Sequence, residues 1–247
     1  MSRNLTLPDA MALGDLRVFL GRAARVDDGS ARLIAVDGVL AVYVAVFYPV
    51  GLLDQAPTIL GLRTFAVQGT EDFDTVVRVS TLAERLTETA TRVIDDTAPL
   101  TVALPPEVTK VSWAAISPPR GGWVQVLPAP ERVLQSTAAD GIAEVAQAIP
   151  TGTGEQIVHR VRSEVWGRPI VGLEHVMSGG AFAALSLGFL GEPAGDSAGT
   201  QVGRPVENLD DDDRRTDVVR VYATGPWTRL TTPRGHVLIK STTRRAL

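Results

Sequence analysis

The sequence has no cysteine and only three histidines. Without cysteine, the chain can form no disulfide, zinc–thiolate site, iron–sulfur cluster or cysteine nucleophile. His159, His175 and His236 have neither a second histidine nor a carboxylate four residues further on, the spacing that places two metal ligands on one helix face. We therefore expect no metal site and no cofactor.

Long apolar runs are also absent. The two longest uncharged stretches, Val39–Leu53 and Val176–Gly191, are shorter than the roughly 18–20 residues that span a bilayer, and both contain glycine. The first residues show no apolar signal core. The sequence thus predicts a soluble, cytoplasmic protein with no membrane partner.

Acidic residues are missing from the end of the chain. Residues 218–247 contain six basic residues and no acid, whereas residues 192–217 contain eight acids and three bases. The basic block could form an anion-binding face. Alternatively, the acidic loop folds back and neutralises the block, or both are simply solvated. The net charge of −4 argues against a general duplex-DNA binder.

The order of the expected elements predicts the fold class. Regular strand–helix alternation and a glycine-rich first turn are both missing, which argues against a Rossmann or barrel enzyme. Strands come first, helices second and a strand pair last, so we predict an α+β fold. Its N-terminal sheet is mixed or antiparallel, its middle is helical, and its C-terminal strand pair rejoins the sheet. We expect a single domain, 1–247, divided into a β-rich region over residues 1–128, a helical region over residues 129–191, a flexible acidic loop over residues 192–217 and C-terminal strands over residues 218–247.

Local patterns set the expected elements. Asp37-Gly38 between two β-rich runs indicates a tight hairpin, because both residues tolerate positive φ. Capping boxes beginning at Thr81 and Thr153 indicate two helix starts. The expected strands are 31–36, 39–48, 59–67, 75–79, 101–104, 108–116, 218–223 and 227–239. The expected helices begin near Pro8, with Thr6 or Leu7 as cap, and then run from 81 toward 93, over 131–149, 154–166 and 180–190.

No catalytic motif is complete in this sequence. Gly195–Gly199 matches a nucleophile elbow, but it lies in the acidic loop and no helix pattern follows it. Pro150–Gly154 resembles a phosphate loop, but Glu155 stands where lysine is required. Carboxylates that could form a catalytic pair are too many for one pair to be singled out: Asp72, Asp74, Asp95, Asp96 and Glu174. The catalytic residues, if any, stay unknown.

The most distinctive feature is a repeated Pro-Arg-Gly beside tryptophan. It occurs within Ser117–Trp123 and again within Trp227–His236, where Thr232–Gly235 is typical of a β-turn. Arginines on rigid turns beside aromatic planes are suited to bind a phosphate, a carboxylate or a peptide. The alternative is a structural role, in which each tryptophan simply packs under a turn arginine. The candidate ligand- or partner-binding residues are Arg120, Trp123, Trp227, Arg229, Arg234 and His236.

Four stretches carry a resemblance to a family: Leu60–Phe65, Ser117–Trp123, Val165–Pro169 and Gly225–Arg229. With them the chain resembles uncharacterised cytosolic proteins of high-GC actinobacteria over most of its length. The resemblance implies a cytoplasmic location and no activity.

Three functional hypotheses remain open. The first is a non-catalytic intracellular binding or protein-interaction module. The second is an enzyme or sensor for a small anionic ligand, with arginines as the clamp and a carboxylate or His236 as acid–base. The third is single-stranded nucleic-acid binding with Trp227 as a stacking platform. The oligomeric state is not predicted.

Overall fold

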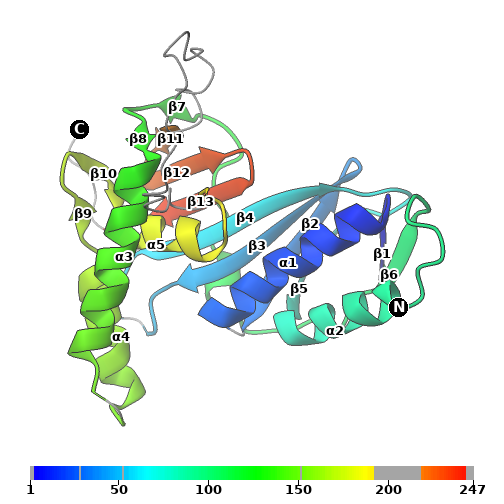
Figure 1. Cartoon of the computed structure of the whole chain (residues 1–247), viewed down its shortest axis with the longest axis horizontal. Coiled ribbons are helices and arrows are strands. Elements are labelled where there is room, and N and C mark those ends of the chain that lie inside the picture. Colours follow the sequence, from blue (N-terminus) through cyan, green and yellow to red (C-terminus); the bar gives the residue numbers. More distant parts are fainter. Residues whose placement is uncertain (1–2, 28, 52, 151, 192–217, 243–247) are drawn as a thin grey trace, which may run out of the picture.

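A computed structural model describes residues 3–27, 29–51, 53–150, 152–191 and 218–242. Strands and helices alternate irregularly around one long antiparallel sheet, which confirms the predicted α+β class (Figure 1). The strands are β1 (Asn4–Leu7), β2 (Ser30–Val36), β3 (Val39–Phe47), β4 (Thr58–Ala66), β5 (Phe73–Arg78), β6 (Leu100–Ala103), β7 (Val124–Gln125), β8 (Ala129–Pro130), β9 (Pro169–Ile170), β10 (Leu173–Met177), β11 (Val218–Thr224), β12 (Trp227–Thr232) and β13 (Gly235–Lys240). The helices are α1 (Ala10–Val26), α2 (Val79–Ala90), α3 (Glu131–Ala148), α4 (Glu155–Trp166) and α5 (Ser178–Ser186), with a 3₁₀ turn at Trp113–Ala115.

The main sheet joins strands from both ends of the chain. Its order is β5-β2-β3-β4-β13-β12-β11-β7, and β8 also pairs with β11. The C-terminal strands rejoin the N-terminal sheet as predicted, through β13 against β4. They are three strands rather than a pair, because the expected turn at Thr232–Gly235 separates β12 from β13. The expected Asp-Gly hairpin is also confirmed, with φ of 51° at Asp37 and 77° at Gly38.

Three expected helix caps are wrong. The α1 helix is capped by Asp9, whose side chain accepts the Ala12 N–H at 2.7 Å, while the residues before Pro8 form β1. The α2 helix already begins at Val79, so Thr81 lies inside it. At α4 the cap is Gly154, and the Thr153 hydroxyl instead donates to the Pro150 carbonyl. Another side chain therefore caps α1, and neither α2 nor α4 has a side-chain cap.

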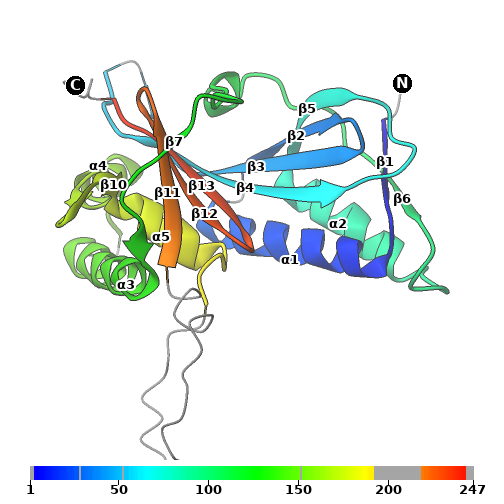
Figure 2. The ribbon, with the colours of Figure 1, turned by 90° about the horizontal axis from the view of Figure 1, so that it is seen from above.

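Helices cover one face of the sheet, and an irregular segment crosses the other (Figure 2). This crossing segment, residues 105–123, was expected to include a strand over 108–116, but it forms the 3₁₀ turn instead. Trp113 seats the segment by packing with Leu60, Leu238 and Trp227. We call the face beneath it the helix-free face.

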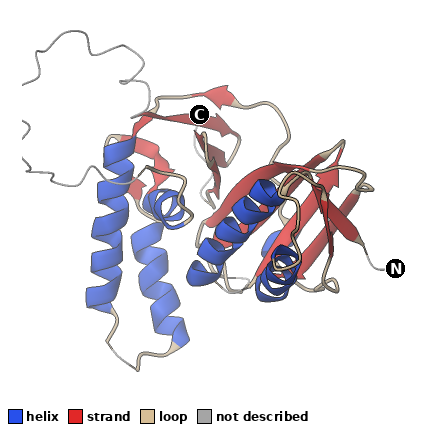
Figure 3. Ribbon diagram, turned by 45° about the vertical axis from the view of Figure 1, so that its right-hand side comes forward, coloured by secondary structure: helices blue, strands red, loops and turns tan. Residues whose placement is uncertain are grey.

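The two halves of the molecule share one arrangement. In the first, β1 pairs with β6, α1 contacts α2, and β5-β2-β3-β4 form four adjacent strands. In the second, β10 pairs with β9, α5 contacts α3, and β8-β11-β12-β13 are adjacent in the same sense. The corresponding elements occur in a different order along the chain, since β8 and α3 precede α5. Figure 3 shows the added helix α4 beside α3.

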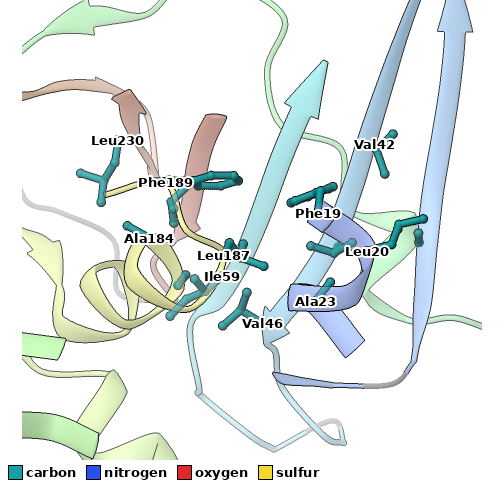
Figure 4. Close-up of a cluster of buried hydrophobic side chains, with 14 of the residues drawn as sticks. Phe19, Leu20, Ala23, Val42, Val46, Ile59, Ala184, Leu187, Phe189 and Leu230 are labelled. Atoms are coloured by element: carbon teal, nitrogen blue, oxygen red, sulfur yellow. The ribbon is translucent and has the colours of Figure 1, made fainter. Parts of the chain in front are cut away.

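The core is continuous across the boundary between the halves (Figure 4). Phe19 of α1 stacks on Phe189, just after α5, with ring centroids 5.8 Å apart. Gly180 lets α5 approach the sheet, because a Cβ there would collide with Ile239. None of the described helices combines the length and apolarity needed to cross a bilayer.

Candidate functional site

An arginine lies between two aromatic rings on the helix-free face. The Arg229 Cζ is 4.6 Å from the Trp123 ring centroid and 4.8 Å from that of Tyr222. Strand register brings one ring to it, because Tyr222 of β11 lies directly opposite Arg229 of β12. The crossing segment supplies the other ring, whose indole Nε1 donates to the Pro119 carbonyl at 3.0 Å. Two aromatic rings from different segments therefore contact the same guanidinium.

The same arginine lacks a full set of hydrogen-bond partners. Its Nε is buried and finds no acceptor among the described residues. Burial lowers the pKa of Arg229, an effect that the nearby Tyr222 opposes. Arginine stays protonated at any physiological pH, so the site holds a fixed positive charge.

His236 of β13 is a neutral neighbour of this charge. Its Nδ1 lies 3.2 Å from the Thr231 hydroxyl. Burial lowers the pKa of His236, and the positive charges of Arg229 and Arg220 lower it further. Because the ordinary pKa of histidine is about 6.5, the ring is neutral at pH 7 and can donate or accept one hydrogen bond.

On the N-terminal half of the face, Arg32 is fully engaged. It donates to both oxygens of Asp74, at 2.8 and 2.6 Å, and to the Ala114 carbonyl and the Ser117 hydroxyl at 2.8 and 2.9 Å. The hydrogen bond from Arg32 lowers the pKa of Asp74, and burial opposes it. Arg32 thus ties the crossing segment to β2 and β5.

A small cavity opens beside Arg32. It has a volume of about 60 Å³ and is lined by Arg32, Tyr43, Ser117 and Arg120, among others. Burial raises the pKa of Tyr43, while Arg32 and Arg120 pull it down. The volume matches about two water molecules and is too small for most substrates.

Among the described residues, Arg120, Arg220 and Arg229 have no carboxylate within ion-pair distance, whereas Arg32 does. Within the part of the chain that the structure describes, three arginines without an ion pair therefore lie on or beside one face. Aromatic rings and a neutral imidazole lie between them.

The structure brings together only some of the predicted set. Trp123, Arg229 and His236 meet, and Arg120 lies beside the Tyr43 cavity on the same face. Trp227 is wrong as a contact residue, because it is 5% exposed beneath the crossing segment. This also removes the expected stacking platform for single-stranded nucleic acid.

Arg234 is exposed and also has a structural contact. Its Nη1 donates to the Leu190 carbonyl at 2.7 Å, which fastens the β12–β13 turn to the chain after α5. One of the two Pro-Arg-Gly arginines therefore stabilises a turn, and its role in binding stays a prediction.

Sequence reasoning missed Tyr222, Arg220 and Tyr43. A signal for the first was present, since Tyr222 and Arg229 are equally distant from the Gly225-Pro226 turn, and strands folded there must pair them. Tyr43 gave no such signal, because its neighbour Arg120 comes from the irregular crossing segment.

The histidines hold no common site. His159 Nε2 lies 2.6 Å from the Asp54 carboxylate, and its ring stacks on Phe47 at 5.0 Å. His175 Nε2 lies 3.0 Å from the Leu127 carbonyl. Among the described residues, no group of three or more potential ligands could hold a metal ion. The Gly195–Gly199 motif and the acidic loop lie outside the described residues.

Comparison with known proteins gives two family matches. Residues 118–244 match the model described as Domain of unknown function (DUF8185), and residues 1–105 match that described as Domain of unknown function (DUF8010). No curated protein matches the chain.

Some solved structures are similar at low identity. The DNA polymerase sliding clamp from Caulobacter crescentus is 13% identical with a TM-score of 0.47, over 99% of this chain and 67% of that chain. The DNA polymerase III subunit beta from Pseudomonas aeruginosa is 11% identical with a TM-score of 0.40, over 99% of this chain and 66% of that one. The chain spans about two thirds of the length of these proteins. At such identities and TM-scores, what those proteins do does not extend to this chain.

Proposed function

The chain belongs to the family described as Domain of unknown function (DUF8185), and we propose that it is a non-catalytic binding module whose helix-free face engages an acidic segment of a partner protein. Two expectations from the sequence belong to the same proposal: a cytoplasmic location, and kinship with the actinobacterial proteins that the chain resembles.

One observation carries the proposal, the guanidinium of Arg229 between Trp123 and Tyr222. The two rings hold the guanidinium without a carboxylate from the described residues, and because Arg229 is only partly buried, its Nη groups can bind an incoming anion. A side chain that is already ordered loses less entropy on binding than a free surface arginine.

The charge around Arg229 supports the choice of partner. Arg220 and Arg120 are exposed and unpaired among the described residues, so this region of the face is cationic. An acidic segment would gain electrostatic attraction along the face, whereas a basic one would be repelled. Tyr222 and Trp123 add the apolar contact that is typical of protein interfaces.

The shape of the face supports binding over catalysis. Its cavity of about 60 Å³ has no room for a substrate of ordinary size. Tyr222 and His236 lie beside Arg229, whereas Arg120 lies beside the cavity near Tyr43, so the arginines do not converge on one pocket.

A defined probe tests the proposal. Fluorescence anisotropy with a labelled glutamate-rich peptide should show binding that weakens as salt is added. The double variant Arg220→Ala/Arg229→Ala should bind about tenfold or more weakly, which corresponds to about 1.4 kcal/mol. The control is Arg132→Ala, which removes one exposed arginine of α3 and should bind as the wild type does.

Two outcomes would overturn the assignment. Equal affinity in the double variant and the Arg132→Ala control would mean that the face makes no specific contact. Displacement of the peptide by single-stranded oligothymidylate, with tighter binding of the oligonucleotide, would favour nucleic acid over an acidic protein segment. The Arg229→Lys variant keeps the charge but loses planar stacking, and it should bind with intermediate affinity.

A further inference from the structure

A second surface, at the opposite end of the sheet from β11, contains a large cavity. It has a volume of about 980 Å³ and opens between β5 and the chain that follows β6. This volume lies at the upper end of the range for ligand-binding clefts. The lining residues are Arg3, Asn4, Gly69, Glu71, Asp72, Phe73, Thr75, Arg85, Leu104, Pro105, Pro106 and Glu107.

Beside this cavity, β5 is an edge strand of the main sheet and has free backbone groups. The Val76 carbonyl accepts the Val108 N–H at 2.8 Å, on the side of β5 away from β2. Because backbone direction alternates along a strand, Asp74, two residues earlier, also directs its N–H and C=O away from β2. Among the described residues nothing bonds to these two groups.

Two prolines explain why the edge stays open. The chain after β6 meets β5 only at Val108 and stays apart from it over Leu104–Glu107. Pro105 and Pro106 have no N–H to offer to the strand edge. The Leu104 N–H, which precedes them, is committed to the Arg3 carbonyl at 2.8 Å. The sequence at this point therefore keeps the chain after β6 from pairing with the edge of β5.

Side chains of several kinds line the cavity beside this edge. Thr75 is only 3% exposed and lines the cavity. Arg85 is held by two bonds from its Nη1, to the Ala103 and Leu104 carbonyls at 2.8 and 2.7 Å. Phe73 adds apolar surface beside them. The cavity therefore offers an occupant a hydroxyl group and an aromatic ring.

From these observations we propose that the free edge of β5 binds an extended peptide segment of a partner protein, which adds to the sheet as a further strand. An extended backbone carries alternating hydrogen-bond donors and acceptors. These could pair with the outward N–H and C=O of Asp74. Its side chains would alternate between the Thr75 and Phe73 side of the sheet and the opposite side. The edge of β5 lies at the opposite end of the sheet from β12 and β11, which carry Arg229 and Tyr222, and its role does not depend on theirs.

A proline substitution isolates the backbone contact. Asp74→Pro removes the outward N–H and leaves the hydrogen bonds from β5 to β2 unchanged, since proline is tolerated on an edge strand. Asp74→Ala is the matched control, because it loses the same carboxylate and the same pair with Arg32 but keeps the N–H. The unfolding midpoints of the two variants are compared first, so that binding is read from folded protein.

The probe is a display library of random heptapeptides. The library is depleted on immobilised Asp74→Pro and then selected on Asp74→Ala, and enriched peptides are synthesised for affinity measurement. We expect peptides that bind wild type and Asp74→Ala equally and Asp74→Pro at least tenfold more weakly. Enrichment of none, or equal affinity for the two variants, would overturn the site.

A second measurement uses the wild-type chain alone, in case Asp74→Pro does not fold. Two versions of a selected peptide are compared, one N-methylated at its odd residues and one at its even residues. Only one of the two should lose binding, because only every second N–H faces β5. Binding that survives methylation in both versions would contradict strand addition. Thr75→Val should weaken the same peptides severalfold through loss of the hydroxyl.

Discussion

On the helix-free face, the arginines of the two halves of the sheet make different contacts. In the first half, Arg32 makes two bonds to Asp74 and two to the crossing segment. In the second half, Arg229 is held by two aromatic rings and has no described carboxylate. On the helix side the halves are alike, since α1 with α2 and α5 with α3 all contribute residues to one core cluster.

This difference separates a structural cation from an available one. A guanidinium whose donors are all satisfied holds its neighbours in place and offers nothing to a ligand. A guanidinium held only by stacking keeps its charge and its edge exposed to a partner. Equal arrangement of the backbone in the two halves therefore does not imply equal function.

The largest effect should come from breaking the contact that unites the halves. Phe19 is 1% exposed and stacks on Phe189 across their boundary. Phe19→Ala should lower the free energy of unfolding by about 3–5 kcal/mol, through lost burial and the cavity left behind. Denaturant unfolding measures it, and Val18→Ala, on the exposed side of α1, should change it by less than about 0.5 kcal/mol. A loss below about 1 kcal/mol at Phe19 would mean that the halves are stable separately.

An intermediate effect should distinguish the two arginines. Arg32→Ala removes a bidentate pair and two further bonds that fix the crossing segment, so we expect a loss of about 2–3 kcal/mol. Arg229→Ala removes two stacking contacts but also an unsatisfied buried Nε, so we expect about 1 kcal/mol or less. Equal losses in unfolding experiments would contradict the division into structural and available cations.

The smallest effect concerns pH. The folded pKa of His236 is lowered, mainly by burial and then by the charges of Arg229 and Arg220. Between the unfolded pKa of about 6.5 and the lower folded value, the unfolded chain binds more protons. Stability from this group is therefore complete above about pH 6.5 and is lost as pH falls through that window.

Unfolding free energies measured from pH 7.5 to pH 5 test the direction. His236→Gln should flatten the pH dependence in this range. Arg229→Ala should flatten it only partially, because burial is the larger cause. A wild-type stability that rises as pH falls from 7 to 5.5 would contradict the buried neutral imidazole.

The fold class followed from local patterns that tertiary structure did not override. Asp37-Gly38 forced a hairpin, and the long helical periods at 131–149 and 154–166 produced α3 and α4 nearly as expected. Helix starts were less predictable. Thr6 or Leu7 was expected as the cap of α1, but the cap is Asp9, the residue directly before the helix.

The candidate site was predictable only where strands set it. Trp123, Arg229 and His236 were named from the sequence, but the role given to Trp227 depended on what covers the sheet. That cover is the crossing segment, whose path is set by contacts such as Arg32 to Ser117, between residues far apart in the chain. Periodicity contains no information about such contacts.

The pairing of β13 with β4 also has a consequence for how the chain reaches this state. Leu238 lies opposite Leu60, so the edge of β4 has no β13 to pair with until roughly 180 further residues have been synthesised. At typical translation rates this delay lasts about 10–35 s. During that time an apolar strand edge is exposed on the ribosome, and its protection falls to chaperones or to transient pairing within the nascent chain.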